Sequence, residues 1–273
     1  MCRLFFIFNH HLTKTELTRI LAQRTRIRKN TPFLKNPRDD GPHKDGFGMA
    51  YQEGEKWISY KSLKNPISKL YDDFKDISKS KLVILHFRHS CHLGESCTIA
   101  TGRTSIENSH PFLYENYVFA HNGNINDFEK KYRTKLRKYI SDDLFSNIKG
   151  ETDSEWIFYM CLTLLQKKKM NSLRNIKTLH SLLKTLLDIL KKECEEFTAN
   201  FIFSNGEISI ITRYIHYDPS KYEEKQEPNS LYYDSTNGFV ISSEPITQHY
   251  TLVPENTAIY VDHSKNRAFL QSL

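Results

Sequence analysis

The chain of 273 residues contains no apolar run that approaches the roughly 18–20 residues of a membrane-spanning helix. Residues 1–9 form a short strand-like run without the length or the small-residue cleavage site of a secretory signal peptide. Internal repeats and low-complexity linkers are also missing. Hydrophobic residues amount to 38% and charged residues to 26%, a composition typical of a globular protein with a sizeable core. We therefore expect a cytoplasmic protein without a membrane segment.

Cysteine is scarce and irregularly spaced. The chain has five: Cys2, Cys91, Cys97, Cys161 and Cys194. An odd number without a regular pattern argues against a disulfide framework and favours a reducing compartment. Cys91 and Cys97 lie near two histidines, but the spacing fits no common zinc pattern and no second pair of ligands follows. We expect no metal and no other cofactor.

The chain has a moderate excess of basic charge. Lysine and arginine number 39 against 32 aspartates and glutamates, a net charge of +7. Such a balance is compatible with a nucleic-acid or acidic partner, but the lysines are scattered, and the run at residues 167–169 suits a helix end. We therefore expect solvated basic residues and no nucleic-acid site; a nucleic-acid binder would show a steep dependence of affinity on salt.

Apolar patterning predicts strands in both outer thirds of the chain and helices between them. Capping boxes at residues 13–16 and 152–155 mark two helix starts, and leucines between residues 179 and 190 form a stripe typical of a core-facing helix or, as the alternative, a partner-binding face. Asn205-Gly206 predicts a hairpin. Strands are expected at residues 2–8, 45–51, 57–60, 82–88, 117–121, 201–203, 208–211, 239–242, 258–261 and 268–270, and a loop at 28–45. This order favours α+β layers over a parallel βαβ sheet.

Cys2 directly follows the initiator methionine. Removal of Met1 would leave a thiol nucleophile and a free α-amine on the same residue. An α-amine has an ordinary pKa of about 7.7–8.0, so it can act as a base near neutral pH. That pairing is the N-terminal version of a nucleophile with its base. The alternative is an ordinary cysteine packed in a first strand.

Three further positions carry polar groups that a purely structural strand or helix does not need. Strand alternation places Arg88 on the face opposite Phe87, where a guanidinium suits a carboxylate ligand, or a structural ion pair. Asn122-Gly123 normally makes a turn, but residues 124–128 look like a helix start, and an amide beside a glycine N–H can hold an oxyanion. Asp153 lies in the predicted first turn of a helix, where a carboxylate is favoured and can also bind an ammonium.

These segments together resemble the glutaminase domain of class II glutamine amidotransferases, which are N-terminal nucleophile hydrolases. Within that family the chain is most similar to stand-alone YafJ-like proteins and to the amidotransferase-like subunit of fungal glutathione degradation. Seven motifs occur in the family's order. They are Met1-Cys2-Arg3, 45–48 (Asp-Gly-Phe-Gly), 86–88 (His-Phe-Arg), 105–112 (Ser-Ile-Glu-Asn-Ser-His-Pro-Phe), 121–123 (His-Asn-Gly), 152–155 (Thr-Asp-Ser-Glu) and 243–245 (Ser-Glu-Pro).

The resemblance implies a fold and a catalytic group. The fold would be a four-layer αββα sandwich of two antiparallel sheets flanked by helices, in a single amidotransferase-like domain over residues 2–273. Cys2 would be the nucleophile, and Asn122 with the backbone N–H of Gly123 would form the oxyanion hole. The segments at 45–48 and 243–245 are interpreted as mainly structural.

The resemblance also implies how a substrate is held. Arg88 would bind the α-carboxylate of a γ-glutamyl substrate and Asp153 its α-ammonium, while Ser90 and His110 match positions that line the pocket. Residues 90–102 are longer than the corresponding loop of relatives, so substrate choice could differ from theirs.

The implied activity is hydrolysis of a γ-glutamyl amide, glutamine or a glutathione-like compound, through a γ-glutamyl thioester. By analogy with the fungal relatives, a peptidase-like or acceptor-enzyme partner subunit is expected. The alternative is a non-catalytic or regulatory subunit that binds a γ-glutamyl ligand or a partner protein. Retention of Met1 would favour that alternative, because the amine base would then be an amide.

Overall fold

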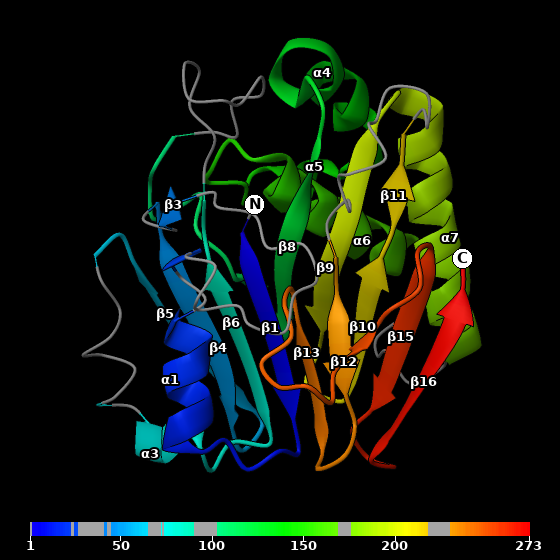
Figure 1. Cartoon of the computed structure of the whole chain (residues 1–273). Coiled ribbons are helices and arrows are strands. Elements are labelled where there is room, and N and C mark those ends of the chain that lie inside the picture. Colours follow the sequence, from blue (N-terminus) through cyan, green and yellow to red (C-terminus); the bar gives the residue numbers. More distant parts are fainter. Residues whose placement is uncertain are drawn as a thin grey trace.

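The computed structural model describes residues 2–22, 25–26, 41–42, 45–64, 72, 74–89, 103–168, 176–217 and 230–273. Ser90, the long segment that follows it and most of the loop expected at 28–45 lie outside the described residues. Two antiparallel sheets dominate the architecture and lie face to face (Figure 1).

The first sheet contains the chain start. Its strands lie in the order β14 (Thr251–Leu252), β12 (Tyr232–Asp234), β13 (Phe239–Ser242), β1 (Arg3–Phe8), β6 (Leu82–Phe87), β4 (Phe47–Glu53) and β5 (Lys56–Ser62). β1 is central and pairs with β13 on one side and β6 on the other. All of its residues are buried, because hydrophobic cores cover both faces of the sheet there. Two short strands, β2 (Thr25–Arg26) and β3 (Gly41–Pro42), form a separate ribbon.

The second sheet is built mainly from the second half of the chain. Its strands lie in the order β16 (Arg267–Ser272), β15 (Thr257–Asp262), β10 (Ile208–Arg213), β9 (Phe197–Ser204), β8 (Tyr117–Ile125) and β7 (Phe112–Tyr114), and β11 (Ile215–His216) also pairs with β9. The predicted hairpin is confirmed, since Asn205 and Gly206 connect β9 to β10. Gly206 adopts φ +84, a conformation that costs glycine little.

Helices cover the outer faces of both sheets. α6 (Asp153–Lys167) and α7 (Ile176–Glu193) pack against the second sheet, and the leucine stripe of α7 is buried there, so its interpretation as core is confirmed. α1 (Lys14–Ala22) and α3 (Phe74–Ile77) lie on the first sheet. A third core lies between the sheets. The predicted αββα sandwich is therefore confirmed. Short helical turns, η2 (Phe128–Tyr132), α4 (Arg133–Leu136), η3 (Arg137–Tyr139) and α5 (Asp142–Phe145), connect β8 to α6.

Only one of the two predicted capping boxes is complete. At α1, the Thr13 N–H donates to Glu16 and the Glu16 N–H donates to the Thr13 hydroxyl, so the two residues satisfy each other. At α6, Thr152 accepts from the Glu155 N–H at 3.2 Å, as predicted. The Glu155 carboxylate, however, accepts from the N–H groups of residues 149 and 150, so it holds the preceding loop instead of closing the box.

The end of β8 differs from the prediction. Asn122-Gly123 does not end the strand, because pairing with β9 continues through Ile125, and the helical segment expected from residues 124–128 begins only at the last of them. Asp127 then leaves the sheet with φ 55, and the helical turn η2 begins at Phe128. Cross-strand pairing has overridden the turn tendency of Asn-Gly. As a result, Asn122 and Gly123 are held by a neighbouring strand.

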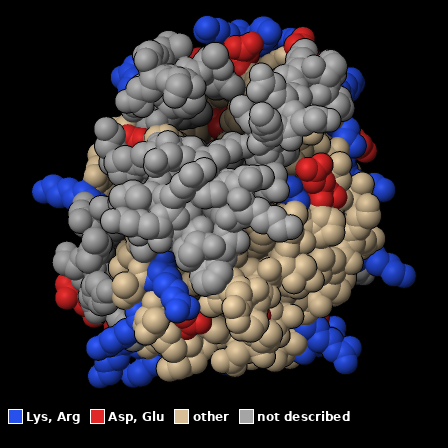
Figure 2. Space-filling model, in the orientation of Figure 1, with Lys and Arg blue, Asp and Glu red and all other residues tan. Residues whose placement is uncertain are grey.

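Charged side chains are dispersed over the described surface. In the face shown in Figure 2, lysine and arginine side chains of described residues lie mostly at the margin, with acidic residues among them. Several lysine and arginine side chains pair with acidic residues, for example Lys131 with Asp127 and Lys138 with Glu193. No helix among the described residues is long and apolar enough to cross a membrane.

Candidate active site

Cys2 lies at the start of β1, beside the residue that follows Arg88 at the end of β6. Its thiol is within hydrogen-bonding distance of both backbone groups of His89: the His89 N–H donates to Sγ at 3.4 Å, and Sγ–H donates to the His89 carbonyl at 3.6 Å. The side chain is partly buried. Two contacts from one neighbouring residue restrict the sulfur to a defined position at this edge of the sheet.

A buried ion pair holds the backbone of the nucleophile candidate. Arg3 is 1% exposed, pairs with Glu244 and donates from Nη1 to the Cys2 carbonyl at 3.2 Å. Glu244 is likewise buried, just beyond the end of β13. A buried charge that lost its partner would be strongly unfavourable, so the pair constrains β1 and the segment after β13 to stay together.

Asn122 reaches across from the second sheet. Its Nδ2 donates to the Ser243 hydroxyl oxygen at 3.0 Å, and the same oxygen accepts from the Leu4 N–H at 2.9 Å. Asn122 and Ser243 are both almost completely buried. Ser243 therefore links the Asn122 amide to the strand that carries Cys2. An amide held through one of its N–H groups still has a second N–H to donate.

Gly123 lies near the end of β8, where a side chain has no room. An added Cβ would lie 2.1 Å from the Thr198 carbonyl oxygen and 2.4 Å from His121 Nε2. His121 is fixed here, because Nε2 bonds the Thr198 carbonyl and Nδ1 bonds the Ser154 hydroxyl, both at 2.9 Å. The backbone at Gly123 is thus packed closely against β9 by the absence of a side chain.

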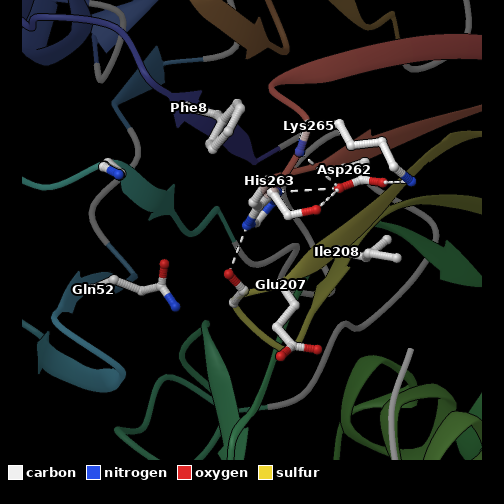
Figure 3. A pocket seen from close by; sticks show the side chains of 10 residues that line it. Phe8, Gln52, Glu207, Ile208, Asp262, His263 and Lys265 are labelled. Atoms are coloured by element: carbon white, nitrogen blue, oxygen red, sulfur yellow. Dashed lines mark hydrogen bonds and ion pairs between the residues drawn. The ribbon is translucent and has the colours of Figure 1, made fainter. Parts of the chain in front are cut away.

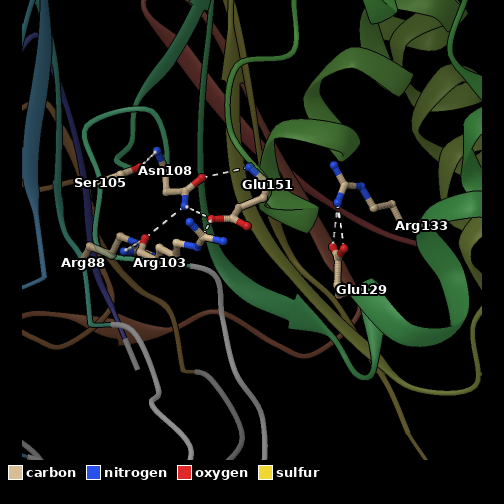
Figure 4. A network of polar contacts seen from close by, with 7 residues as sticks. All are labelled: Arg88, Arg103, Ser105, Asn108, Glu129, Arg133 and Glu151. Atoms are coloured by element: carbon tan, nitrogen blue, oxygen red, sulfur yellow. Dashed lines mark hydrogen bonds and ion pairs between the residues drawn. The ribbon is translucent and has the colours of Figure 1, made fainter.

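Arg88 belongs to a network that connects β6 to the start of α6 (Figure 4). Its Nη1 donates to the Arg103 carbonyl at 3.0 Å, which also accepts from Asn108 Nδ2 at 2.9 Å. Asn108 Oδ1 accepts from the Glu151 N–H at 2.9 Å. Burial lowers the pKa of the Arg88 guanidinium, and interactions with Cys2, Asp45, Asp153 and Glu151 oppose this shift. Arg88 and Asp153 therefore lie within electrostatic range of each other and of the thiol.

Asp153 is the first residue of α6 and faces the end of β8. Its Oδ2 accepts from the Ile125 N–H at 2.6 Å, and its Oδ1 accepts from the Ser154 N–H at 2.8 Å. The carboxylate therefore lies beside the strand that carries Asn122 and Gly123. The side chain remains partly exposed, so a substrate ammonium could reach it.

His110 is as buried as Arg88 and Asn122. It is 4% exposed, and its ring lies 4.2 Å from that of His86 and 4.6 Å from that of Phe112. Neither ring nitrogen of His110 has a hydrogen-bond partner among the described residues. Burial lowers the pKa of His110 well below its usual value and that of His86 to about 3, so both are neutral.

A separate cavity lies at the other end of the sandwich (Figure 3). Its volume is about 590 Å³, and Phe8, Gln52 and His263 are among its lining residues. The His263 ring stacks on Phe8 at 4.5 Å. Phe8 ends β1, whereas Cys2 precedes that strand, so this cavity and the predicted site lie at opposite ends of β1. Among the described residues no cluster of histidine, cysteine and acidic side chains could hold a metal ion.

The structure brings Cys2, Arg88, Asn122, Gly123 and Asp153 to one end of the sandwich, while Ser90 lies outside the described residues. The sequence interpretation missed residues that orient this group. It treated residues 45–48 and 243–245 as mainly structural, yet Ser243 bonds Asn122, and Glu244 pairs with the arginine that holds Cys2. The sequence contains one indication that Ser243 and Glu244 contribute to the site, namely that they belong to one of the seven motifs.

Comparisons with known proteins agree with this architecture. A model of the class II glutamine amidotransferases matches residues 29–216. The chain is 27% identical over 263 residues to a protein of Saccharomyces cerevisiae named "Probable glutamine amidotransferase DUG3", covering 80% of this chain and 69% of that one. A protein of Haemophilus influenzae named for the same activity is 28% identical over 229 residues, covering 77% and 70%.

A solved structure supports the fold independently. A protein from Silicibacter pomeroyi described as a glutamine aminotransferase class-II domain protein superposes with a TM-score of 0.58 over 99% of both chains, at 18% identity. At that identity the likeness concerns the fold alone. Since the family model covers more than half of the chain, the chain belongs to the class II glutamine amidotransferases and has their N-terminal nucleophile hydrolase fold.

Proposed function

We propose that the protein hydrolyses the γ-amide bond of a γ-glutamyl substrate, with Cys2 as an N-terminal nucleophile. The observation that carries the proposal is the convergence of a thiol, a buried guanidinium and a carboxylate at one end of the sandwich. The family match begins at residue 29, after Cys2, so the role of Cys2 is inferred from its surroundings.

Removal of Met1 would free the Cys2 α-amine, which takes the thiol proton, directly or through a water. The thiolate then attacks the γ-carbonyl carbon, and its oxygen becomes negatively charged. The Asn122 amide and the Gly123 N–H are the donors that we assign to this oxyanion. The amine departs, and water hydrolyses the resulting γ-glutamyl thioester.

The charges around the site suit the two charged groups on the α-carbon of the glutamyl group. We assign the α-carboxylate to Arg88, because a guanidinium binds a carboxylate through two parallel hydrogen bonds. We assign the α-ammonium to Asp153. In the structure the Arg103 carbonyl accepts from Arg88, so a substrate carboxylate would take over or share that donor.

Glutamine and glutathione present the same glutamyl end, so these contacts accept either. Released ammonia or peptide would then pass to a peptidase-like or acceptor-enzyme subunit, which we propose as a partner by analogy with family members.

The test is product analysis with glutamine, glutathione and other γ-glutamyl amides. We expect an intact mass that lacks one methionine, hydrolysis by the wild type and no measurable hydrolysis by Cys2→Ala. Cys161→Ala is the matched control, because Cys161 is 1% exposed in the helical core and burial raises its pKa. Full hydrolysis by a correctly folded Cys2→Ala variant would refute the proposal. Retained Met1 with no hydrolysis would favour a regulatory subunit.

A further inference from the structure

Cys2 lies just outside the ladder of the sheet that carries it. The last pair between β1 and β6 is Arg3 opposite Phe87, so Cys2 is one residue beyond that ladder. Removal of Met1 would leave Cys2 attached to the chain on one side only. Chain ends are poorly ordered unless other contacts hold them, so a nucleophile at this position needs a contact to its own backbone.

Arg3 makes such a contact. Its Nη1 donates to the Cys2 carbonyl at 3.2 Å, and its Nη2 is paired with Glu244 Oε1. The side chains of Arg3 and Glu244 are 1% and 6% exposed, so the pair is enclosed by the protein. Strand pairing brings Glu244 here: the Ser243 N–H donates to the Leu4 carbonyl at 3.0 Å, which continues the register of β13 with β1.

Stability alone does not explain a buried ion pair at this position. The cost of removing two charges from water is about as large as their attraction, so apolar side chains of similar volume would stabilise the fold equally well. Apolar side chains, however, could not hold a carbonyl. A guanidinium has a fork of donors, so Arg3 can bind the Glu244 carboxylate and the Cys2 carbonyl at the same time.

The charge of Arg3 lies close to the α-amine that is the base of the proposed reaction. Within one residue the amine nitrogen is at most about 3.6 Å from the carbonyl oxygen, so the Cys2 amine lies within about 7 Å of Arg3 Nη1. An unbalanced positive charge at that distance would lower the pKa of the amine by about one unit or more. Glu244 supplies the balancing charge. Burial raises the pKa of Glu244, and the charge of Arg3 opposes this rise.

We propose that Arg3 and Glu244 are positioning residues of the reaction. Arg3 holds the Cys2 carbonyl, and with it the orientation of the thiol and the α-amine, while Glu244 cancels the charge that Arg3 brings to the amine. The inference rests on the proposed function of Cys2. The other charged or titratable groups that the structure places around Cys2 are Arg88 and His89 after β6, Asp45 before β4, and Glu151 and Asp153 at the start of α6.

The charge balance is tested by the pH dependence of kcat/KM for γ-glutamyl hydrolysis. Glu244→Gln keeps the size of the side chain but removes its charge, so Arg3 should favour the neutral form of the amine. We expect the acid limb of the profile to move to lower pH by about one unit. The double variant Arg3→Met, Glu244→Gln lacks both charges, so its acid limb should return to the wild-type position while kcat stays low.

Arg3→Lys tests the hold on the carbonyl separately. A lysine keeps the charge but lacks the fork, so the acid limb should stay at the wild-type position. We expect kcat to fall about 10- to 100-fold, the loss that a small misplacement of a reacting group produces, with little change in KM.

Asp262→Asn is the matched control, because Asp262 is also buried and ion-paired, with Lys265 at the remote cavity. It should lower the melting temperature and leave the acid limb and kcat unchanged. An unshifted acid limb in folded Glu244→Gln, or a wild-type kcat in Arg3→Lys, would overturn the proposal. If Glu244→Gln does not fold, Arg3→Lys decides. Failure of the proposed function itself is recognised separately, by hydrolysis that survives Cys2→Ala.

Discussion

Ser243→Ala removes a single oxygen that connects the two sheets at the active site. That oxygen accepts from Asn122 Nδ2 at 3.0 Å and from the Leu4 N–H at 2.9 Å, in a position that is 3% exposed. Each buried donor left without a partner costs about 1–3 kcal/mol, so the two cost about 2–6 kcal/mol of unfolding free energy if neither finds another acceptor. The Asn122 amide also loses the contact that sets its orientation.

The expected kinetic effect follows from the proposed role of Asn122. Complete loss of one oxyanion donor costs about 10²–10³ in kcat, and a misoriented donor should cost less, about 10- to 100-fold. KM should change little, because Ser243 contacts neither Arg88 nor Asp153 in the described part of the structure. Urea unfolding measures the stability, and γ-glutamyl hydrolysis at saturating substrate measures kcat.

Ser209→Ala is the control for stability alone. Ser209 is fully buried, and its hydroxyl contacts Ser204 and His263 near the remote cavity. We expect it to lower the unfolding free energy while kcat stays unchanged. If Ser243→Ala kept the wild-type kcat, or if Ser209→Ala lost as much activity, Ser243 would not orient the oxyanion donor.

Three further predictions concern the same end of the sandwich. Gly123→Ala should abolish hydrolysis and lower the melting temperature, because its Cβ would lie 2.1 Å from the Thr198 oxygen; a normally active, equally stable variant would contradict this packing. Asp153→Asn should raise KM for γ-glutamyl substrates more than tenfold by losing an ammonium ligand of about 1.5–3 kcal/mol, as initial rates would show, whereas an unchanged KM would move the ammonium elsewhere. Below its ordinary pKa of 6.5, His86 is protonated in the unfolded chain but stays neutral in the fold down to about pH 3. As the pH falls from about 6.5 towards 3, the unfolding free energy should therefore decrease by up to about 1.4 kcal/mol per pH unit. Urea midpoints measure this slope, and His86→Gln should reduce it.

The sequence was sufficient to predict the layers of the fold and to identify the polar residues of the candidate site. A continuous apolar run predicted β6, the leucine stripe predicted the core-facing side of α7, and Asn205-Gly206 predicted the hairpin of β9 and β10. These features depend on local periodicity and turn chemistry, which can be recognised in a short stretch of one sequence. The motif order further predicted the family, which the family match confirms.

Local patterns failed where a distant strand decided the outcome. Asn122-Gly123 has the composition of a turn, but pairing with Asn200 and Ala199 of β9 keeps the segment extended. Glu155 has the spacing of a capping-box residue, but the N–H groups of the preceding loop are its partners in the fold. In both cases the competing hydrogen bonds come from backbone groups whose proximity no short window of sequence contains.

By itself, the sequence determined which chemical groups the protein has: a cysteine after the initiator methionine, an arginine at the end of a buried strand, and an asparagine beside a glycine. Only the tertiary structure decided how they are held. Ser243 and Glu244 are more than a hundred residues from Asn122 and from Arg3, yet they bond to them at the active site. His89 lies between Cys2 and Asp45 because three strands that are separated along the chain are neighbours in one sheet. Hydrogen bonds and ion pairs act over a few ångströms, so only folding could specify these contacts.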